Sequence, residues 1–422
     1  MHMGSVIGVD DTDSRSAGMC TTYVGATIAD DLATAGHTVE ERRLVRLNPA
    51  VEHKTRGNAA VAIRTSAPPV TAMDVARDRV EELAVTDDPS TQPGLAVVDA
   101  GRAGLLADHT WRAIREVVSL DDARSQLRAA DARTWSAGGG RGLIGAAAAI
   151  GASHAVDEWT VELVLYRERH RWGTPREMDP ASAFAASAAT YPRTWDTVDV
   201  EAGEVVCTPN TPGPVLAGLR GDDREAVSAA AALLEHEPTE RQSLFRTNQG
   251  TDAHLVPGAP GALRDGRSYR VTASVTSQPE TRPGGHVHLT VGSGGATLPC
   301  VAFEPTGRFR DRIRQLRRGD RVTVCGEVGR GTLKLEKFAL RRPRRYRRKV
   351  PDCPSCGRRM ESAGRTQGYR CRQCDTTAAH KQLLATDREL SVGWYEVPPV
   401  ARRHLARPLV RGGFDGPVHP ER

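Results

Sequence analysis

Residues 5–36 read SVIGVDDTDSRSAGMCTTYVGATIADDLATAG, and this stretch decides the fold of the first part of the chain. It opens with a short apolar run that predicts a buried strand. Apolar residues then recur at four-residue steps between positions 24 and 32, which predicts an amphipathic helix. Three acids, Asp10, Asp11 and Asp13, therefore occupy a loop that leads from a strand into a helix.

The position of these acids favours a site for a metal and a nucleotide. A loop before a helix presents backbone N–H groups and the positive end of the helix dipole, which attract phosphate. Carboxylates in the same place repel phosphate unless a hard cation lies between them, and Mg²⁺ is the usual cation. The alternative is that the acids cap the helix and a turn, but one cap needs one acid rather than three.

Length and hydropathy suggest a protein of several domains that does not enter a membrane. A chain of 422 residues is long for a single core and suggests roughly two to four domains. The longest uncharged apolar run, GLIGAAAAIGA at 142–152, is too short to span a bilayer, and no charged-then-apolar leader opens the chain. We therefore expect a cytoplasmic protein with no membrane partner.

Charge is divided unequally between the two halves of the chain. Residues 1–250 contain 25 basic and 36 acidic side chains, a net charge of −11, whereas residues 251–422 contain 33 basic and 16 acidic side chains, a net charge of +17. A strongly basic half predicts a polyanionic partner.

Four of the eight cysteines form two CxxC pairs within CPSCGRRMESAGRTQGYRCRQC: Cys353, Cys356, Cys371 and Cys374. Two such pairs supply four thiolates at a spacing that suits tetrahedral Zn²⁺ in a closed structural site. In a chain without a secretion signal, paired spacing favours metal ligation over disulfides. A redox dithiol or chance pairs are the alternative.

The sequence before the cysteines is typical of nucleic-acid binding. RRPRRYRRK at 341–349 carries seven cations around Tyr346, which predicts contacts with a phosphate backbone and a stacking ring. Upstream, about five short alternating strands with a helical RFRDRIRQL at 308–316 between the third and fourth match the pattern of an OB-fold. Other small β-barrels fit nearly as well, and the pattern does not choose between DNA and RNA.

Two stretches of the acidic half are further candidates for phosphate contact. Lys54 and Arg56 precede a predicted strand and suit a transferring phosphate, with a basic hairpin as an equal alternative. Near residue 140, glycine allows close approach to an anion and Arg141 offers a bidentate fork, although a flexible turn is the alternative because no Walker motif or dinucleotide fingerprint is present. The glycines are Gly138, Gly139, Gly140 and Gly142.

Residues 156–255 suggest an α+β sandwich in which CTPNTPGPVLAGLRGDD, residues 207–223, forms a loop. Its segment TPNTPGP at 208–214 is expected to be a shaped loop at a site. Four polar residues lie in or near this loop: Asp222, Asp223, Asp252 and His254. They could bind a cationic substrate or exchange a proton, and the alternative is that the acids cap helices.

Taken together, the motifs resemble the archaeal tRNA(Ile) 2-agmatinylcytidine synthetases, the TiaS family. The resemblance rests on IGVDDTDS with GMCTTYVG, NPAVEHKTRGNAAVAI, GGGRGLIGAAAAIGA, TPNTPGPVLAGLRGD and FRTNQGTDAHL, followed by the barrel pattern and the four cysteines. These motifs run in the same order along nearly the whole chain.

The resemblance implies a multidomain α+β fold. Its expected parts are a kinase-like α/β domain that binds ATP at 5–150, a ferredoxin-like domain at 151–262, an OB-fold β-barrel at 266–342, a basic linker with a zinc ribbon at 343–380, and a C-terminal extension at 381–422.

It also implies a reaction, in which ATP is cleaved to AMP. The carbon-2 oxygen of the wobble cytidine is phosphorylated and then displaced by agmatine, and the tRNA is the isoleucine tRNA with a CAU anticodon that reads AUA. By the same resemblance, Asp10, Asp11 and Asp13 hold Mg²⁺ and serve phosphoryl transfer, and Thr21 is a threonine that becomes phosphorylated. The implied cofactors are ATP, Mg²⁺ and Zn²⁺.

General chemistry agrees with this reaction. The carbonyl oxygen of a pyrimidine is a poor leaving group, so an amine displaces it only after activation, and an unpaired wobble base is reached by splaying. A non-enzymatic nucleic-acid-binding protein with an OB-fold and a zinc ribbon leaves the acidic half unexplained. A small-molecule kinase leaves the basic half unexplained.

Overall fold

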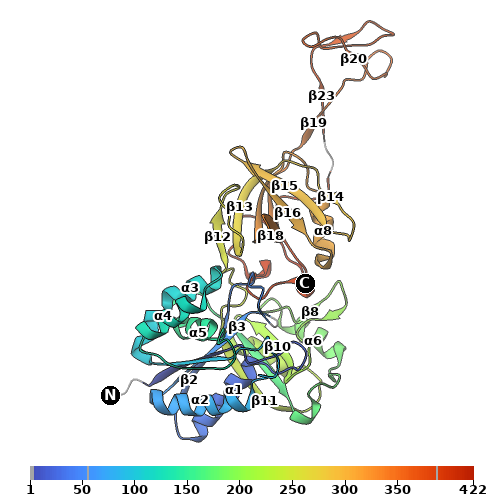
Figure 1. Ribbon diagram of the computed structural model, residues 1–422. Coiled ribbons are helices and arrows are strands. Elements are labelled where there is room, and N and C mark those ends of the chain that lie inside the picture. Colours follow the sequence, from blue (N-terminus) through green and yellow to red (C-terminus); the bar gives the residue numbers. More distant parts are fainter. Residues whose placement is uncertain (1–3, 55–56, 386–387) are drawn as a thin grey trace.

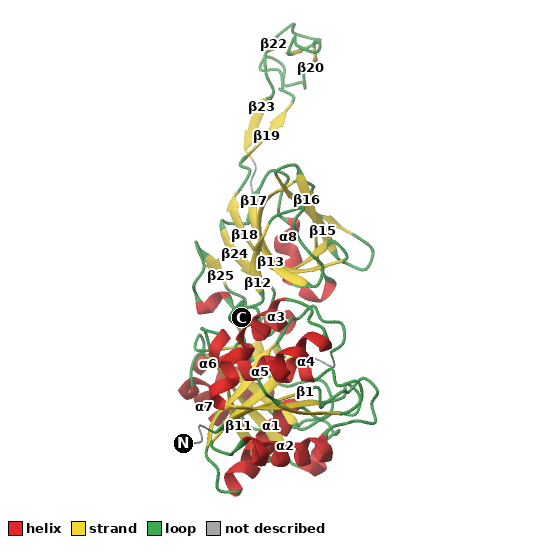
Figure 2. Ribbon diagram, turned by 60° about the vertical axis from the view of Figure 1, so that its left-hand side comes forward, coloured by secondary structure: helices red, strands yellow, loops and turns green. Residues whose placement is uncertain are grey.

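The computed structural model describes residues 4–54, 57–385 and 388–422. Figure 1 shows three parts stacked in one direction: a broad base of helices around a sheet, a barrel, and a small module at the far end. Figure 2 shows the same arrangement, with the small module carried on two narrow strands. Every helix in the described part of the chain is too short or too polar to cross a bilayer.

One nine-stranded sheet runs through the whole base, in the order β5-β4-β1-β3-β2-β11-β6-β10-β7. Its strands are β1 (Ser5–Asp10), β2 (Val39–Arg46), β3 (Ala59–Thr65), β4 (Gly94–Asp99), β5 (Arg133–Ser136), β6 (Thr160–Arg167), β7 (Thr194–Trp195), β10 (Val215–Gly221) and β11 (Thr239–Thr247). A short parallel pairing of β11 with β2 joins the two halves, with Arg246 opposite Arg43 and Thr247 opposite Leu44. The sheet is therefore continuous across the expected boundary at residue 150.

The predicted first strand and helix are confirmed. β1 lies between β3 and β4 and is antiparallel to both. Its alternate residues face two different cores: Ile7 and Val9 pack with α1 (Thr21–Thr34) and α2 (Pro69–Leu83), whereas Val6 packs with the opposite layer. That layer contains η1 (Ala100–Leu106), α3 (Ala107–Arg115), α4 (Leu120–Ala129) and α5 (Leu143–Ala155).

The second half of the base packs α6 (Pro180–Thr190) and α7 (Arg224–Ala232) against β6 and β10. Short elements flank it: η2 (Arg169–Arg171), β8 (Val198–Asp199) and β9 (Glu204–Val205). The expected loop over 207–223 is wrong for the part that forms β10. Proline ends at residue 214, and the following apolar VLAGLRG pairs along β6, while 208–214 is irregular as predicted.

The predicted barrel is confirmed as a closed ring of five strands. Its members are β13 (Arg267–Val275), β15 (Val287–Ser293), β16 (Ala296–Ala302), β17 (Arg321–Gly329) and β18 (Thr332–Arg342). They pair in the circular order β13-β15-β16-β18-β17. α8 (Arg308–Arg314) follows η3 (Glu304–Thr306) and lies between the third and fourth strands, as expected, and β12 (Leu255–Gly258) and β14 (Glu280–Thr281) pair at the edges.

The small module is reached through a stalk of β19 (Tyr346–Lys349) paired with β23 (Gln382–Ala385), and contains β20 (Glu361–Ser362), β21 (Tyr369–Arg370) and β22 (Thr377–Ala378). Residues 388–422, named here the C-terminal strap, then return to the barrel. β24 (Gly393–Glu396) pairs with β18, and β25 (Val418–His419) pairs with β24. The strap also contains η4 (Pro399–Ala401) and η5 (Leu409–Arg411).

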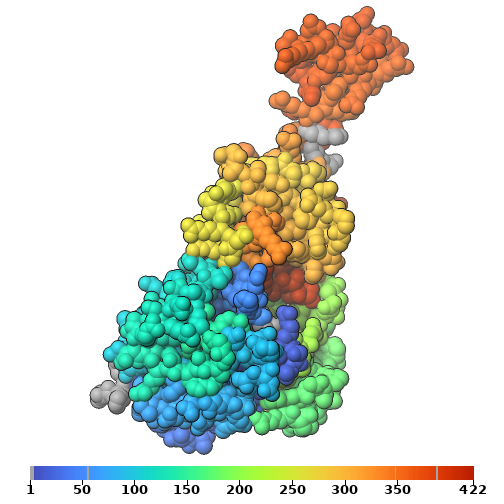
Figure 3. Space-filling view, in the orientation of Figure 1, coloured from blue at the N-terminus to red at the C-terminus, as the bar shows by residue number. Residues whose placement is uncertain are grey.

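Ion pairs fasten the strap to the base, and Figure 3 shows the last residues in red between base and barrel. Arg402 is buried and contacts Asp196 of the base, and its Nη2 lies 3.0 Å from Glu396 Oε1 of the strap. Arg407 lies 2.7 Å from Glu158. These pairs hold the C-terminal strap against the first part of the chain.

Substitution Arg402→Met is expected to lower the free energy of unfolding by roughly 3–5 kcal/mol, because Asp196 and Glu396 then lack their buried partner. Urea unfolding of the full chain measures the change. The control is Arg282→Met, which removes an exposed pair with Glu280 and should change stability by about 0.5 kcal/mol or less. Equal losses in the two variants would contradict a clamping role.

Candidate active site

Three hollows of the base meet at Gly57, which lines all of them. The acidic hollow, about 140 Å³, is bordered by Asp10, Asp11, Asp13, Lys54, Arg141 and Gly145. The central hollow, about 340 Å³, is bordered by Asp13, Thr21, Arg46, Glu162, Arg220 and His404. The barrel-side hollow, about 450 Å³, is bordered by Arg46, Lys54, Glu327, Lys334, Arg403 and His404.

The structure brings the three acids together at the acidic hollow. The backbone N–H of Asp11 donates to Asp10 Oδ1 at 2.7 Å, and Asp11 has a φ of 58°, a conformation that Asp tolerates better than most residues. Burial raises the pKa of Asp10 well above its ordinary value, and the charges of Asp11 and Asp13 raise it further. Burial also raises the pKa of Asp11, against the opposing effect of Arg141. A cation in this hollow would relieve the crowded negative charge.

The arrangement of the acids suits a metal with an incomplete protein shell. Within the described ranges, groups of three or more ligand atoms all within 4.8 Å of one another occur at the four cysteines and at Asp252, His254 and Glu336, but not at the three aspartates. Mg²⁺ commonly takes one or two carboxylates and completes its shell with phosphate oxygens and water. The acids fit such a site.

The glycine-rich stretch packs closely behind the acids. A Cβ on Gly145 would lie 1.9 Å from Asp10 Oδ2, and one on Gly142 would lie 2.4 Å from the backbone nitrogen of Gly94. Arg141 reaches the hollow, where its Nη2 donates to Asp11 Oδ2 at 2.9 Å and to Ser90 O at 2.7 Å.

None of the four predicted glycines, Gly142 included, borders the acidic hollow. Gly138 and Gly139 pack against the side chain of Gln92, and Gly140 packs against Ser136. Their contact with a cofactor stays a prediction.

The predicted basic pair is only partly described. Lys54 borders the acidic and barrel-side hollows, and its ammonium donates to the carbonyl oxygens of Pro49 and Val51, the latter at 2.8 Å. Arg56 lies outside the described residues.

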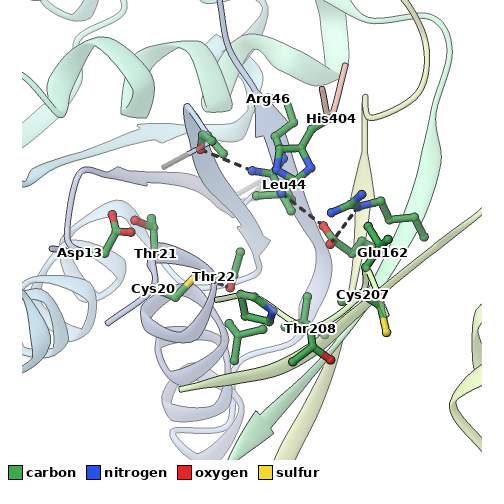
Figure 4. Close-up of a pocket in the computed structure, with 18 of the residues that line it drawn as sticks. Asp13, Cys20, Thr21, Thr22, Leu44, Arg46, Glu162, Cys207, Thr208 and His404 are labelled. Atoms are coloured by element: carbon green, nitrogen blue, oxygen red, sulfur yellow. Dashed lines mark hydrogen bonds and ion pairs between the residues drawn. The ribbon is translucent and has the colours of Figure 1, made fainter. Parts of the chain in front are cut away.

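Thr21 is the first residue of α1, and Cys20 precedes it as the N-cap. Its Oγ1 lies 3.0 Å from Thr12 Oγ1. Figure 4 shows Asp13 and Thr21 side by side at one end of the central hollow, with Glu162 and Cys207 at the other. The positive end of the α1 dipole therefore points at the place where the acidic and central hollows adjoin.

Several polar residues of the central hollow were not predicted from the sequence. Glu162 of β6 is buried and lies 3.6 Å from Arg46 Nη2 and 3.6 Å from Arg220 Nε, and it accepts a hydrogen bond from Gln249 at 2.5 Å. A single Glu inside the apolar run TVELVLY was a usable signal for a buried charge. His404 gave no such signal, because it reaches the hollow from the strap.

The structure shows where two predicted groups within residues 208–254 lie and what they contact. The predicted loop TPNTPGP borders the central hollow through Thr208, Pro209 and Asn210. Of the three acids, Asp223 caps a helix, α7, whereas the other two pair with cations. Asp252 accepts from Lys337 Nζ at 2.7 and 2.8 Å, Asp222 pairs with Arg411, and His254 pairs with Glu336.

The four predicted cysteines converge at the small module, with all four sulfur atoms within 4.8 Å of one another. Cys356 Sγ lies 3.6 Å from Cys371 Sγ. Four thiolates at this separation fit a tetrahedral Zn²⁺ site, and the thin stalk leaves little other core to hold the module together.

These features define a class of protein: an enzyme in which an α/β base with an acidic site suited to phosphate is joined to a barrel and a four-cysteine module, both typical of nucleic-acid binding. Comparison with known proteins gives the family. Family models match residues 6–139 (TiaS TCKD domain), 140–254 (TiaS FLD domain) and 350–390 (TiaS C-terminal zinc ribbon domain). The chain belongs to the TiaS family of isoleucine-tRNA 2-agmatinylcytidine synthetases, which confirms the resemblance.

Individual relatives are similar over their whole lengths. The 2-agmatinylcytidine synthetase TiaS of Haloquadratum walsbyi is 49% identical, with 99% of this chain and 100% of the relative covered. That of Methanosarcina mazei is 45% identical, with 96% and 97% covered. A solved complex of TiaS with its isoleucine tRNA and ATP matches this chain with a TM-score of 0.91 at 41% identity. A complex with the tRNA, AMPCPP and agmatine matches with a TM-score of 0.88 at 39% identity. Both comparisons cover 100% of this chain and 100% of the solved chain.

Zinc content tests the four-cysteine module. The full chain should contain one zinc per molecule, and Cys353→Ser should lose it and unfold the module, because a three-thiolate site is incomplete. Elemental analysis measures the metal. Ser355→Ala, within the same CxxC turn, is the control and should retain zinc. Metal-free protein purified without chelator would contradict the assignment.

Proposed function

We propose that this chain attaches agmatine to the wobble cytidine of the AUA-reading isoleucine tRNA at the expense of ATP. The carrying observation is that the acidic hollow and the central hollow share Asp13, Gly57 and Ala59. A place for phosphate chemistry therefore adjoins a polar place for a base and an amine. The relatives of this chain are named for this reaction, and their solved complexes contain the isoleucine tRNA, ATP or AMPCPP, and agmatine.

ATP is assigned to the acidic hollow. Asp10, Asp11 and Asp13 would hold Mg²⁺, which would neutralise and orient the phosphates. Lys54, Arg141 and the glycine stretch Gly138–Gly142 would contact the nucleotide, and the family pattern adds Arg56. The hydrogen bond from Arg141 to Asp11 supports this assignment, because it places the guanidinium beside the acids, where it can bind a phosphate oxygen.

The central hollow is assigned to the cytidine and to agmatine. Phosphorylation of the carbon-2 oxygen makes it a leaving group, which agmatine then displaces, and ATP ends as AMP. Thr21 is proposed to accept a phosphoryl group. Its hydroxyl lies at the N-terminus of α1, which stabilises negative charge.

The proposed domains would together deliver the tRNA to these hollows. We assign a kinase-like domain to 5–150, a ferredoxin-like domain to 151–262, an OB-fold to 266–342, a basic linker with the zinc ribbon to 343–380, and an extension to 381–422. The barrel has the strand order and helix position of an OB-fold. The basic second half of the chain suits the tRNA backbone, and the reaction is expected in the cytoplasm.

The decisive experiment incubates the protein with ATP, agmatine and the AUA-reading isoleucine tRNA and analyses the anticodon nucleosides by mass. The wild-type chain should yield the agmatine adduct and AMP. Asp11→Asn should reduce both by at least about 100-fold while tRNA binding persists, since the metal site lies in the acidic half. The control is Asp415→Asn, an exposed acid of the strap. Undiminished AMP formation in Asp11→Asn would contradict the metal assignment.

Thr21→Ala should abolish labelling of the protein by the γ-phosphate of ATP and strongly reduce tRNA modification. Thr21→Ser, which restores a hydroxyl at the same place, should regain both in part. Labelling of the alanine variant at the wild-type level would show that the acceptor lies elsewhere.

A further inference from the structure

We propose that Asp320 of the barrel is a positioning residue for the tRNA, because it holds both ends of the zinc-ribbon stalk at one point. The inference rests on the proposed function, in which the ribbon contacts the tRNA. The stalk consists of β19 and β23, and its two ends join the barrel near Arg344 and Arg388. A pair of short strands has little stability of its own, so the direction of the stalk depends on how these ends are held.

Both ends of the stalk reach the same carboxylate. On the side that enters the stalk, the backbone N–H of Arg344 donates to Asp320 Oδ1 at 2.7 Å. On the side that returns, Arg388 Nη1 donates to the same oxygen at 2.8 Å, and Arg388 Nη2 donates to Gln315 O at 3.3 Å. Two segments that the whole stalk and ribbon separate in the chain therefore meet at one side chain.

The carboxylate is itself fixed within the barrel. Asp320 Oδ2 accepts from the backbone N–H of Arg317 at 2.8 Å, which closes the turn between α8 and β17. This turn is joined to β13, since Gly319 N donates to Val275 O and Val275 N donates to Asp320 O, both at 2.8 Å. Gly319 has a φ of 96°, and a Cβ there would lie 2.9 Å from Arg344 Cδ, so glycine lets the entering chain pass close to the turn.

Burial and charge indicate that Asp320 acts through the residues that it binds. The residue is fully buried and does not face the RNA, although its neighbourhood is basic: LRRGDR at 316–321 and RRPRRYRRK at 341–349. An exposed acid there would repel a phosphate backbone, whereas the buried one pairs with Arg388, whose side chain is only 7% exposed. Removal of either partner leaves the other buried without its counter-charge, which favours release of the stalk end.

The test measures modification of the AUA-reading isoleucine tRNA by the full chain, with tRNA and ATP concentrations varied separately. Arg388→Gln and Asp320→Asn should each raise the KM for tRNA by roughly 10-fold, because a loosely held ribbon no longer adds its affinity to that of the barrel. The kcat at saturating tRNA, the KM for ATP and the zinc content should stay at wild-type values, since the proposed chemistry lies in the base. Arg388→Lys, which keeps a cation beside the carboxylate, should regain most of the affinity.

The signs of the two changes separate positioning from simple electrostatics. If charge alone acts, loss of an acid should strengthen binding to a polyanion and loss of a cation should weaken it. Both variants should instead weaken binding, and the double variant should be no weaker than either single one. The matched control is the exposed pair of Glu280 and Arg282, for which Glu280→Gln and Arg282→Gln should change the KM for tRNA by no more than about twofold.

Hydrogen exchange measures whether the stalk is loosened without unfolding of the barrel. In both variants the amides of β19 and β23 should exchange faster, while those of β13 and β15 keep their protection. If Asp320→Asn also exposes the barrel strands, Arg388→Gln decides, because it leaves the hydrogen bonds of the turn in place.

Three results would overturn the proposal: an unchanged KM for tRNA in Arg388→Gln, shifts of opposite sign in the two variants, or a loss that falls equally on kcat and on the KM for ATP. Wild-type protein that modifies no tRNA would instead refute the proposed function.

Discussion

The close approach of α5 to β1 is the contact on which the site depends. A Cβ on Gly8 would lie 2.1 Å from Ala146 O, and one on Gly145 would meet the Asp10 carboxylate. With glycine at these places, the helix backbone lies directly against the strand and the acids that follow it. The carboxylates are thereby held away from bulk water, which raises the pKa of Asp10 and Asp11.

Much of the fold was predictable from local sequence because its signals are local. The strand before Asp10, the helix from Thr21, the five barrel strands and the cysteine pairs each follow from a pattern within a few dozen residues. The strand at 215–221 was missed because the prolines before it suggested a loop. The joining of β2 to β11 was also missed, since it pairs residues about two hundred positions apart and has only a short register.

Only the acidic hollow of the candidate site was predictable from the sequence. Asp10, Asp11, Asp13 and Arg141 belong to motifs whose chemistry is visible in sequence, and the structure gathers them at one hollow. The central hollow is different, because β2, β6, β10 and the strap each contribute to it. Apart from Asp13, its charged residues stand alone in their own segments, so only tertiary packing assigns them to a site.

The positive charge of residues 251–422 correctly predicted a polyanionic partner, but not all of that charge is free to bind it. Part of the positive charge of the second half is not available for RNA, because Arg308, Arg402, Arg407 and Arg411 pair with acids of the base. The pairs of Arg402, Arg407 and Arg411 hold the strap over the base, and the pair of Arg308 joins the barrel to the base. The barrel and the ribbon extend away from the base (Figure 1). The same segment that returns from the zinc ribbon also brings His404 to the central hollow. Because β24 of the strap pairs with β18, the position of this hollow's lining relative to the barrel is fixed by the strap.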